Sequence, residues 1–269
     1  MKKILGVLII MVLLVGCSGD NGSNEEVSTL VVGMECNYAP FNWSQTNETE
    51  TAVAISAVDY CDGYDVSVAK KIADNLNKEL KIVAVTWNGL IPALNNGEID
   101  LIIAGMTKTE ERSQAVNFSE PYYTSEMVMI VRKDDALTSA TSIQDFSGKK
   151  VLGQINTLYD EIIDQIDGVI HVSPLKNYPR MVMSLQEGEV DALTAELPVA
   201  QGVVAANDDL AIVTFDEGNG FVADTTVSIA VAKDNTDLLE GVQAALDGIS
   251  EEERVEMMRE ATNRQPAVE

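Results

Sequence analysis

The same pattern of seven residues occurs twice in the chain, as LNNGEID at residues 94–100 and as LQEGEVD at residues 185–191. A helix-like pattern precedes each copy, a glycine stands where the helix would end, and a short apolar run follows at 101–104 and 192–195. The copies lie 91 residues apart (185 − 94), which is too far for a solenoid repeat. The repetition predicts two similar α/β lobes.

The segments before the first copy alternate between two kinds of periodicity. Short apolar runs at 29–33, 81–86 and 99–104 indicate strands, and the spacing of apolar residues at 64–78 and 90–97 indicates helices. Alternating strands and helices predict an α/β protein with a mostly parallel sheet that helices cover on both faces.

Two further apolar runs end alike and suggest where the chain passes between the lobes. MVMIV at 127–131 precedes RKDD, and VSIAVA at 227–232 precedes KDN. We expect two crossover strands here, with a first lobe of residues 28–132 plus 227–269 and a second lobe of residues 133–226. Two crossings with polar edges suit a hinge.

The N-terminus carries an export signal. Two lysines precede an apolar run at 4–15 that is too short to span a bilayer, which predicts a signal peptide over residues 1–16. The sequence LVGC that ends at Cys17 resembles a bacterial lipobox, which implies lipidation of Cys17 and an exported protein anchored on the outer face of the cell membrane. The alternative is an ordinary signal peptide with a chance cysteine. Residues 17–27 read as a flexible tether.

The charge balance excludes some partners. The chain has 43 acidic and 18 basic residues, for a formal net charge of −25. That charge argues against nucleic acid and against peripheral binding to an anionic membrane, both of which select Lys and Arg. It serves solubility, or it raises the local concentration of a cationic ligand.

The residue inventory favours binding over catalysis. His171 is the single histidine, which leaves little room for a Ser-His-Asp or Cys-His site, and no phosphate-binding glycine motif is present. We therefore expect no catalytic residues, no metal and no cofactor. Cys36 and Cys61 are candidates for a disulfide, which export permits. The alternatives are two free buried thiols or thiols near a ligand.

Polar residues follow the predicted strands, and ligands of open α/β sheets bind at such carboxyl ends. Arg112 is suited to pair with a carboxylate, and Glu196 is suited to hold an ammonium group. Thr157 opens a predicted helix whose free amides favour anions. Aromatic residues at strand ends, Tyr38 and Trp87, are placed to sandwich a flat or extended side chain.

Four segments together resemble a known family. GMECNYAPFNW (33–43), GYDVSVAKKIA (63–73), the long segment from WNGLIPAL to NFSEPYY (87–123) and GEVDALTAELPVA (188–200) are similar to the polar amino-acid binding proteins of ABC importers, solute-binding protein family 3. The resemblance implies a periplasmic-binding-protein-like fold whose two lobes close on an amino acid. It also implies delivery of that amino acid to an importer permease. We expect a monomer.

The resemblance also implies roles for individual residues. Arg112 would clamp the ligand carboxylate, and Glu196 would hold the ammonium group. The other residues that the motifs place at the ligand are Glu35, Tyr38, Asn42, Trp87, Gly105, Met106, Thr107, Thr157 and Leu158. Of these, Tyr38 and Trp87 would flank the side chain, and Glu35 and Asn42 would lie near its tip. The chain departs from the family pattern where Glu196 replaces Asp, Asn156 replaces Gly and Leu158 replaces Thr.

The ligand's side chain is the open point. Glu35, the aromatic pair and the negative net charge favour a cationic amino acid of the arginine or lysine type. If Glu35 pairs locally, the alternative is a neutral polar amino acid such as glutamine, or cystine. Two other classes are an enzyme on the same scaffold, such as a dehydratase, and a sensor domain.

Overall fold

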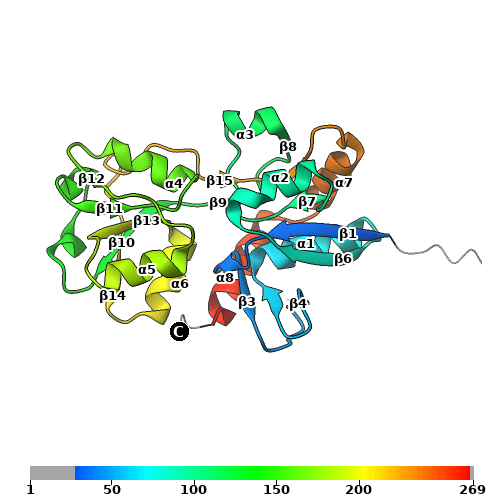
Figure 1. Cartoon of the computed structure of the whole chain (residues 1–269), viewed down its shortest axis with the longest axis horizontal. Helices are drawn as coiled ribbons and strands as arrows, with labels where there is room; N and C mark the ends of the chain where they lie inside the picture. The colour runs from blue at the N-terminus through cyan, green and yellow to red at the C-terminus, as the bar shows by residue number, and fades with distance from the viewer. Residues whose placement is uncertain (1–27, 267–269) are drawn as a thin grey trace, which may run out of the picture.

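The computed structural model describes residues 28–266 of the 269-residue chain. The predicted signal peptide (1–16) and the predicted tether (17–27) with Cys17 lie outside the described residues. Within residues 28–266, no helix combines the length and the apolar character needed to cross a membrane. Figure 1 shows the described chain as two lobes that lie side by side.

The first lobe is built on a five-stranded sheet. Its strand order is β6 (Glu79–Ala84), β1 (Thr29–Met34), β7 (Leu101–Ile102), β16 (Ala230–Ala232) and β8 (Val116–Phe118). β1 is parallel to β6 and β7, whereas β16 is antiparallel to both of its neighbours. The helices of this lobe are α1 (Tyr64–Asn75), α2 (Leu90–Asn95), α3 (Glu110–Ala115), α7 (Thr236–Asp247) and α8 (Glu251–Arg264), with the short η1 (Trp87–Gly89).

The second lobe repeats this plan with a second five-stranded sheet. Its order is β12 (Ile170–His171), β11 (Lys150–Leu152), β13 (Ala192–Glu196), β10 (Met127–Arg132) and β14 (Leu210–Val213). The helices are α4 (Leu158–Glu161), α5 (Tyr178–Gln186) and α6 (Leu197–Ala206), with η2 (Ala136–Ser139), η3 (Ile143–Phe146) and η4 (Ile162–Gln165).

A small sheet extends the first lobe. It has the order β2 (Asn37–Tyr38), β3 (Asn42–Gln45), β5 (Tyr60–Asp62) and β4 (Val53–Ala54), and all its pairs are antiparallel. This sheet holds the segment that follows β1 against the start of α1.

The repeated seven-residue pattern has the same structure in both lobes. Its glycines, Gly97 and Gly188, have φ of 72° and 75°, a conformation that favours glycine and that ends α2 and α5. Its last residue then joins the sheet. The side chain of Asp100 accepts a 2.8 Å hydrogen bond from the Val31 amide, and Asp191 accepts one of 2.8 Å from the Lys150 amide. The pattern therefore pins each helix end to the neighbouring strand.

The predicted α/β class and the two lobes agree with the structure, but two details differ. The sheets are mixed rather than mostly parallel, because β10, β14 and β16 run against their neighbours. The crossing also falls earlier than residue 132. β10 pairs with β13 and β14 in the second sheet, so the chain has already changed lobes there. An apolar run identifies a buried strand but does not say which sheet takes it.

The two connections between the lobes pair with each other. The chain leaves the first lobe through β9 (Tyr123–Thr124) and returns through β15 (Thr226–Val227), and these strands form an antiparallel two-stranded sheet. Figure 1 shows this pair between the lobes. A paired two-strand connection suits a hinge.

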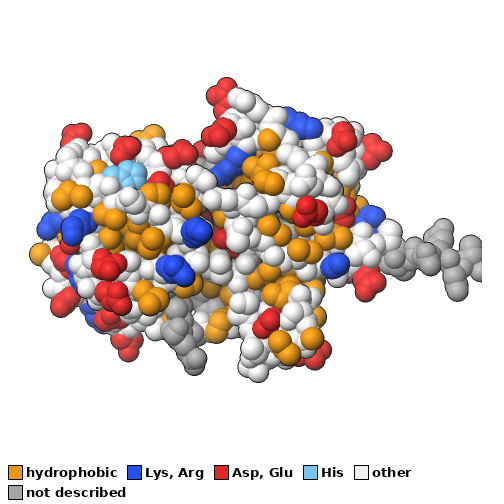
Figure 2. Space-filling model, viewed as in Figure 1, with side chains coloured by type: hydrophobic (Ala, Val, Ile, Leu, Met, Phe, Trp, Pro, Cys, Tyr) orange, Lys and Arg blue, Asp and Glu red, His pale blue; other side chains and the backbone are white. Residues whose placement is uncertain are grey.

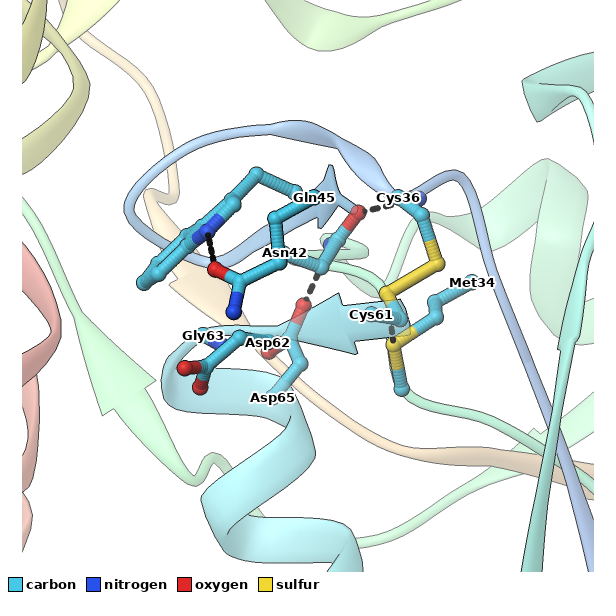
Figure 3. The surroundings of a disulfide bond; sticks show 9 residues. Met34, Cys36, Asn42, Gln45, Cys61, Asp62, Gly63 and Asp65 are labelled. Carbon is cyan, nitrogen blue, oxygen red and sulfur yellow. Dashed lines mark hydrogen bonds between the residues drawn. A yellow bond between two sulfur atoms is a disulfide. The ribbon is translucent and has the colours of Figure 1, made fainter. Parts of the chain in front are cut away.

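A disulfide fixes the segment between β1 and β3. Cys36 and Cys61 are bonded, with their Cα atoms 5.7 Å apart, so the candidate pairing is formed. Figure 3 shows the bond beside Met34 and Asn42. Asn42 accepts a hydrogen bond from the Cys36 amide (2.7 Å) and donates one to the buried Asp65 (2.7 Å). Covalent and polar contacts thus hold the loop that carries Glu35.

We predict that loss of this disulfide lowers the stability of the protein. The bridged cysteines are 25 residues apart, and closing a loop of that size contributes roughly 3 to 4 kcal/mol to the free energy of unfolding. Urea denaturation of a Cys36→Ser/Cys61→Ser variant should therefore show a lower midpoint than the oxidised protein. The reduced wild-type protein is the control and should match the variant. Equal midpoints for oxidised and reduced protein would contradict this role.

Candidate functional site

The lobes meet where the carboxyl ends of their strands face each other, and side chains contact across that junction. Tyr38 of the first lobe donates a 2.5 Å hydrogen bond to Glu196 of the second. Trp87 and Arg112 of the first lobe both donate to the carbonyl of Asn156, at 2.9 and 3.0 Å. The structure therefore has the lobes in a closed arrangement.

The carboxylate of Glu196 is the most deeply buried charged group in this junction. It stands at the end of β13, and its side chain is fully buried. Its Oε1 atom accepts the Tyr38 hydroxyl, whereas Oε2 has no hydrogen-bond partner. The hydroxyls of Tyr159 and Ser125 are also buried without a partner of normal hydrogen-bond geometry. Both lie near the Glu196 carboxylate and stabilise its charged form. Unpartnered polar atoms grouped in this way suit a ligand group that donates several hydrogen bonds.

Burial raises the pKa of Glu196 from its usual value to about 7. The hydroxyls of Tyr159, Tyr38 and Ser125 act in the opposite direction, because they stabilise the carboxylate. Among residues 28–266, no Lys, Arg or His forms an ion pair with Glu196. The protein leaves this negative charge uncompensated.

Arg112 is the cation of the site. Its backbone amide donates to the hydroxyl of Thr109, the N-cap residue of α3, and its guanidinium lies 5.1 Å from the centre of the Trp87 ring, in cation–π contact. The guanidinium donates to the carbonyl of Thr107 (2.7 Å) in its own lobe and to Asn156 in the other. Both acceptors are neutral carbonyls, so the guanidinium charge also has no carboxylate partner among the described residues.

Glu35 forms a second negative position. It follows β1, and its carboxylate accepts hydrogen bonds from the Trp87 amide (3.2 Å) and from the side-chain amide of Gln154 (3.1 Å). Gln154 belongs to the second lobe and is buried. Burial raises the pKa of Glu35 to about 6, against the smaller effect of these two donors. Both donors are neutral, and in the described part of the chain this carboxylate forms no ion pair.

A cavity of about 500 Å³ opens beside Arg112 at the junction. Its lining includes the predicted residues Trp87, Met106 and Arg112, together with Asn156 and Glu161. Figure 2 shows the surface hollowed between the lobes, with acidic side chains around the hollow. Trp87 and Arg112 thus face open space as well as each other.

The remaining predicted residues, Gly105, Thr107, Thr157 and Leu158, lie in the segments that surround this junction. Gly105 has φ of 60°, and the ring of Tyr38 lies so near that a Cβ at Gly105 would be 3.1 Å from it. Thr107 is buried, and its backbone forms an isolated antiparallel β-bridge with Val227 of β15. Thr157 and Leu158 begin α4, and the Thr157 hydroxyl donates to the carbonyl of Gln154.

One predicted residue, Asn42, lies differently from what the resemblance implies. Asn42 is fully buried within the first lobe, and both ends of its amide are engaged by Cys36 and Asp65. It supports the loop rather than facing the junction. Tyr38 stacks on Phe41 (5.4 Å between ring centres) and directs its hydroxyl to Glu196, which places its ring at the junction.

The structure adds residues that the sequence did not single out. Tyr159, Ser125 and Gln154 contribute polar groups to the junction. Tyr159 lies one residue after Leu158 on α4 and is buried. The feature that could have pointed to Tyr159 is its residue type, because the hydroxyl of a tyrosine among apolar residues requires a hydrogen-bond partner when it is buried.

Comparison with known proteins agrees with this geometry. The model of the bacterial extracellular solute-binding proteins, family 3, matches residues 30–261. A "probable histidine-binding protein" of Campylobacter jejuni is 32% identical over 82% of this chain and 85% of its own length. The L-cystine-binding protein TcyJ of Escherichia coli is 29% identical over 82% of this chain and 77% of its own length.

A solved structure shows the same likeness. The amino-acid ABC transporter substrate-binding protein AbpA of Streptococcus pneumoniae, bound to L-arginine, superposes with a TM-score of 0.75 at 29% identity, over 88% of this chain and 95% of that one. Fold and site define a two-lobed binding protein of the periplasmic type. This chain belongs to the bacterial extracellular solute-binding proteins of family 3, a family of exported transport proteins rather than enzymes, and it is a binding protein for polar amino acids.

We predict that Glu196→Gln flattens the dependence of stability on pH. The pKa of Glu196 in the folded protein, about 7, lies above its usual value of 4.5. The protonated form therefore stabilises the fold below pH 4.5, and this contribution is lost as pH rises through 7, at about 1.4 kcal/mol per unit of pKa difference. Urea denaturation at pH 5 and pH 8 should show a smaller loss of stability for the variant than for the wild type. Parallel losses in the two proteins would contradict the assignment.

Proposed function

We propose that this protein binds an L-amino acid with a cationic side chain, of the arginine or lysine type, between its lobes and delivers it to an ABC importer. The relatives do not decide the ligand, because their names include histidine, cystine and arginine. The side chain must be argued from the charges of the site itself.

The observation that carries the proposal is the charge balance across the junction. Glu35 and Glu196 are carboxylates without a cation, and Arg112 is a guanidinium whose observed acceptors are neutral carbonyls. A basic amino acid carries the complementary set, with two positive groups and one negative group. A charge in a closed cleft is costly unless it is paired. A neutral amino acid would pair with Arg112 and Glu196 but would leave Glu35 unmatched.

The neutral groups that hydrogen-bond to Glu35 are also consistent with a cationic ligand. Gln154 and the Trp87 amide already direct donors at Glu35, which positions its carboxylate without neutralising it. Arg112 lies on one face of the Trp87 indole, and a cationic ligand side chain would gain from contact with the same aromatic surface. The ligand would displace the Tyr38 hydroxyl from part of the Glu196 carboxylate, or share that carboxylate with it.

The ligand assignment predicts a selective effect of Glu35→Gln. Titration calorimetry with L-arginine, L-lysine, L-glutamine and L-cystine at pH 7.5 should find arginine or lysine bound most tightly by the wild type. Because Glu35→Gln removes one charge and keeps the shape, affinity for the basic ligand should fall about tenfold or more, with little change for glutamine. Lowering the pH below about 6 should weaken the basic ligand more than glutamine in the wild type, since Glu196 and Glu35 then both take up a proton and only the basic ligand pairs with Glu35.

Control variants separate this claim from general damage. Arg112→Ala should abolish binding of every amino acid, since all share the carboxylate, whereas Arg112→Lys should retain weak binding. Tightest binding of glutamine or cystine by the wild type would refute the cationic assignment. Turnover of any of these ligands would refute a role limited to transport.

We further propose that the protein acts as a monomer held by a lipid at Cys17 on the outer face of the cell membrane. The support is the lipobox-like sequence LVGC and the short apolar run before it. Cys17→Ala should release the protein into the soluble fraction, and metabolic labelling with a fatty acid should fail for the variant. Continued lipid labelling of the variant would contradict the assignment.

A further inference from the structure

The last turn of α8 lies at the junction but takes no part in the amino-acid site. α8 belongs to the first lobe, where Lys71 of α1 pairs with Glu253 at 2.5 Å and Arg254 donates to the carbonyl of Pro121 at 2.9 Å. Figure 1 shows α8 ending beside α6 of the second lobe, and the two helices are in contact. The end of α8 therefore reaches across the boundary between the lobes.

Arg264 anchors this end firmly to the first lobe. Its guanidinium forms an ion pair with the buried Asp62 (3.1 Å) and donates to the hydroxyl of Ser67 (3.2 Å). It also lies 5.8 Å from the centre of the Trp43 ring, in cation–π contact. An ion pair with a buried carboxylate and an aromatic contact fix the position of the residue that follows.

That next residue, Gln265, rests on the second lobe. Its side-chain amide lies against Gly202 in the middle of α6, so that a Cβ at Gly202 would be 2.4 Å from the amide nitrogen. A glycine inside a helix is less favourable than alanine, because it loses more backbone freedom on folding. The close approach of Gln265 gives a physical reason for glycine here.

Gly202 and Gln265 both line an apolar groove of about 180 Å³ between the lobes. Its lining comes from the first lobe, including Asn37 and Trp43, from the second lobe, including Val182 and Val199, and from Gln265. The amide nitrogen of Gln265 and the side-chain oxygen of Asn37 are both buried without a partner. Unpaired polar groups each reduce the net stability of the contact, which leaves it weak enough to open.

We propose that residues 264–266 form a latch that stabilises the closed arrangement of the lobes. Arg264 holds the latch to the first lobe, and Gln265 engages α6 of the second at Gly202. The latch lies apart from Arg112, Glu35 and Glu196, so it shifts the balance between open and closed forms without touching the ligand. A latch that changes the population of the closed form changes the apparent affinity for the ligand in proportion.

Substitutions at the contact test the latch. Gly202→Ala adds a methyl group that meets only the flexible end of Gln265, and it favours the helix. The variant should therefore keep or raise the melting temperature but have a larger radius of gyration by small-angle X-ray scattering in the absence of amino acid. Gln265→Ala should give the same increase, and Gly202→Ala in the Gln265→Ala background should add nothing.

The control is Gln201→Ala, an exposed neighbour on α6 that should keep the wild-type radius. Equal radii for the wild type and all variants would overturn the latch. So would additive increases from Gly202→Ala and Gln265→Ala, because that result shows that the two residues do not act through one contact. Neither outcome depends on which amino acid the protein binds.

Discussion

The rest of the structure depends on a buried carboxylate that the protein itself does not neutralise. Glu196 ends a central strand of the second lobe, and closure covers it with Tyr38 of the first. Burial disfavours the charged form of this carboxylate and so raises its pKa. The carboxylate is stabilised either by taking up a proton or by pairing with a cation. An α-ammonium group supplies that cation, so ligand capture stabilises the closed arrangement of the lobes. Glu35 and Arg112 then extend the same principle, because neither charge has an ion-pair partner among residues 28–266.

These charges work only if their scaffold is fixed. The repeated seven-residue pattern pins a helix end to the sheet in each lobe through Asp100 and Asp191. The loop that carries Glu35 is held by the Cys36–Cys61 disulfide and by Asn42. Movement is left to the paired strands β9 and β15 and, in our proposal, to the latch at the end of α8. Rigid lobes, a short hinge and unpaired charges on opposite sides of one junction are the physical requirements of a protein that closes on a zwitterion.

The sequence predicted the lobes well and the site in part. Periodicity and the repeated pattern identified the helices and strands, since both depend on local spacing. The boundary after residue 132 could not be placed, because the apolar run of β10 is compatible with either sheet. The resemblance pointed to Arg112, Glu35 and Glu196, which the structure brings to the junction. It could not show that Asn42 turns inward to Asp65, or that Gln154 and Tyr159 join the site, because these contacts depend on how two distant segments pack.

The central claim is that the junction selects a ligand with a second positive charge. L-arginine and L-citrulline have nearly the same shape, but only arginine carries a charged side chain at neutral pH. Titration calorimetry of the wild-type protein with the two ligands at pH 7.5 therefore isolates the charge that Glu35 would pair with. We predict that arginine binds at least about tenfold more tightly than citrulline, a difference of about 1.4 kcal/mol or more. Equal affinities, or tighter binding of citrulline, would contradict the account.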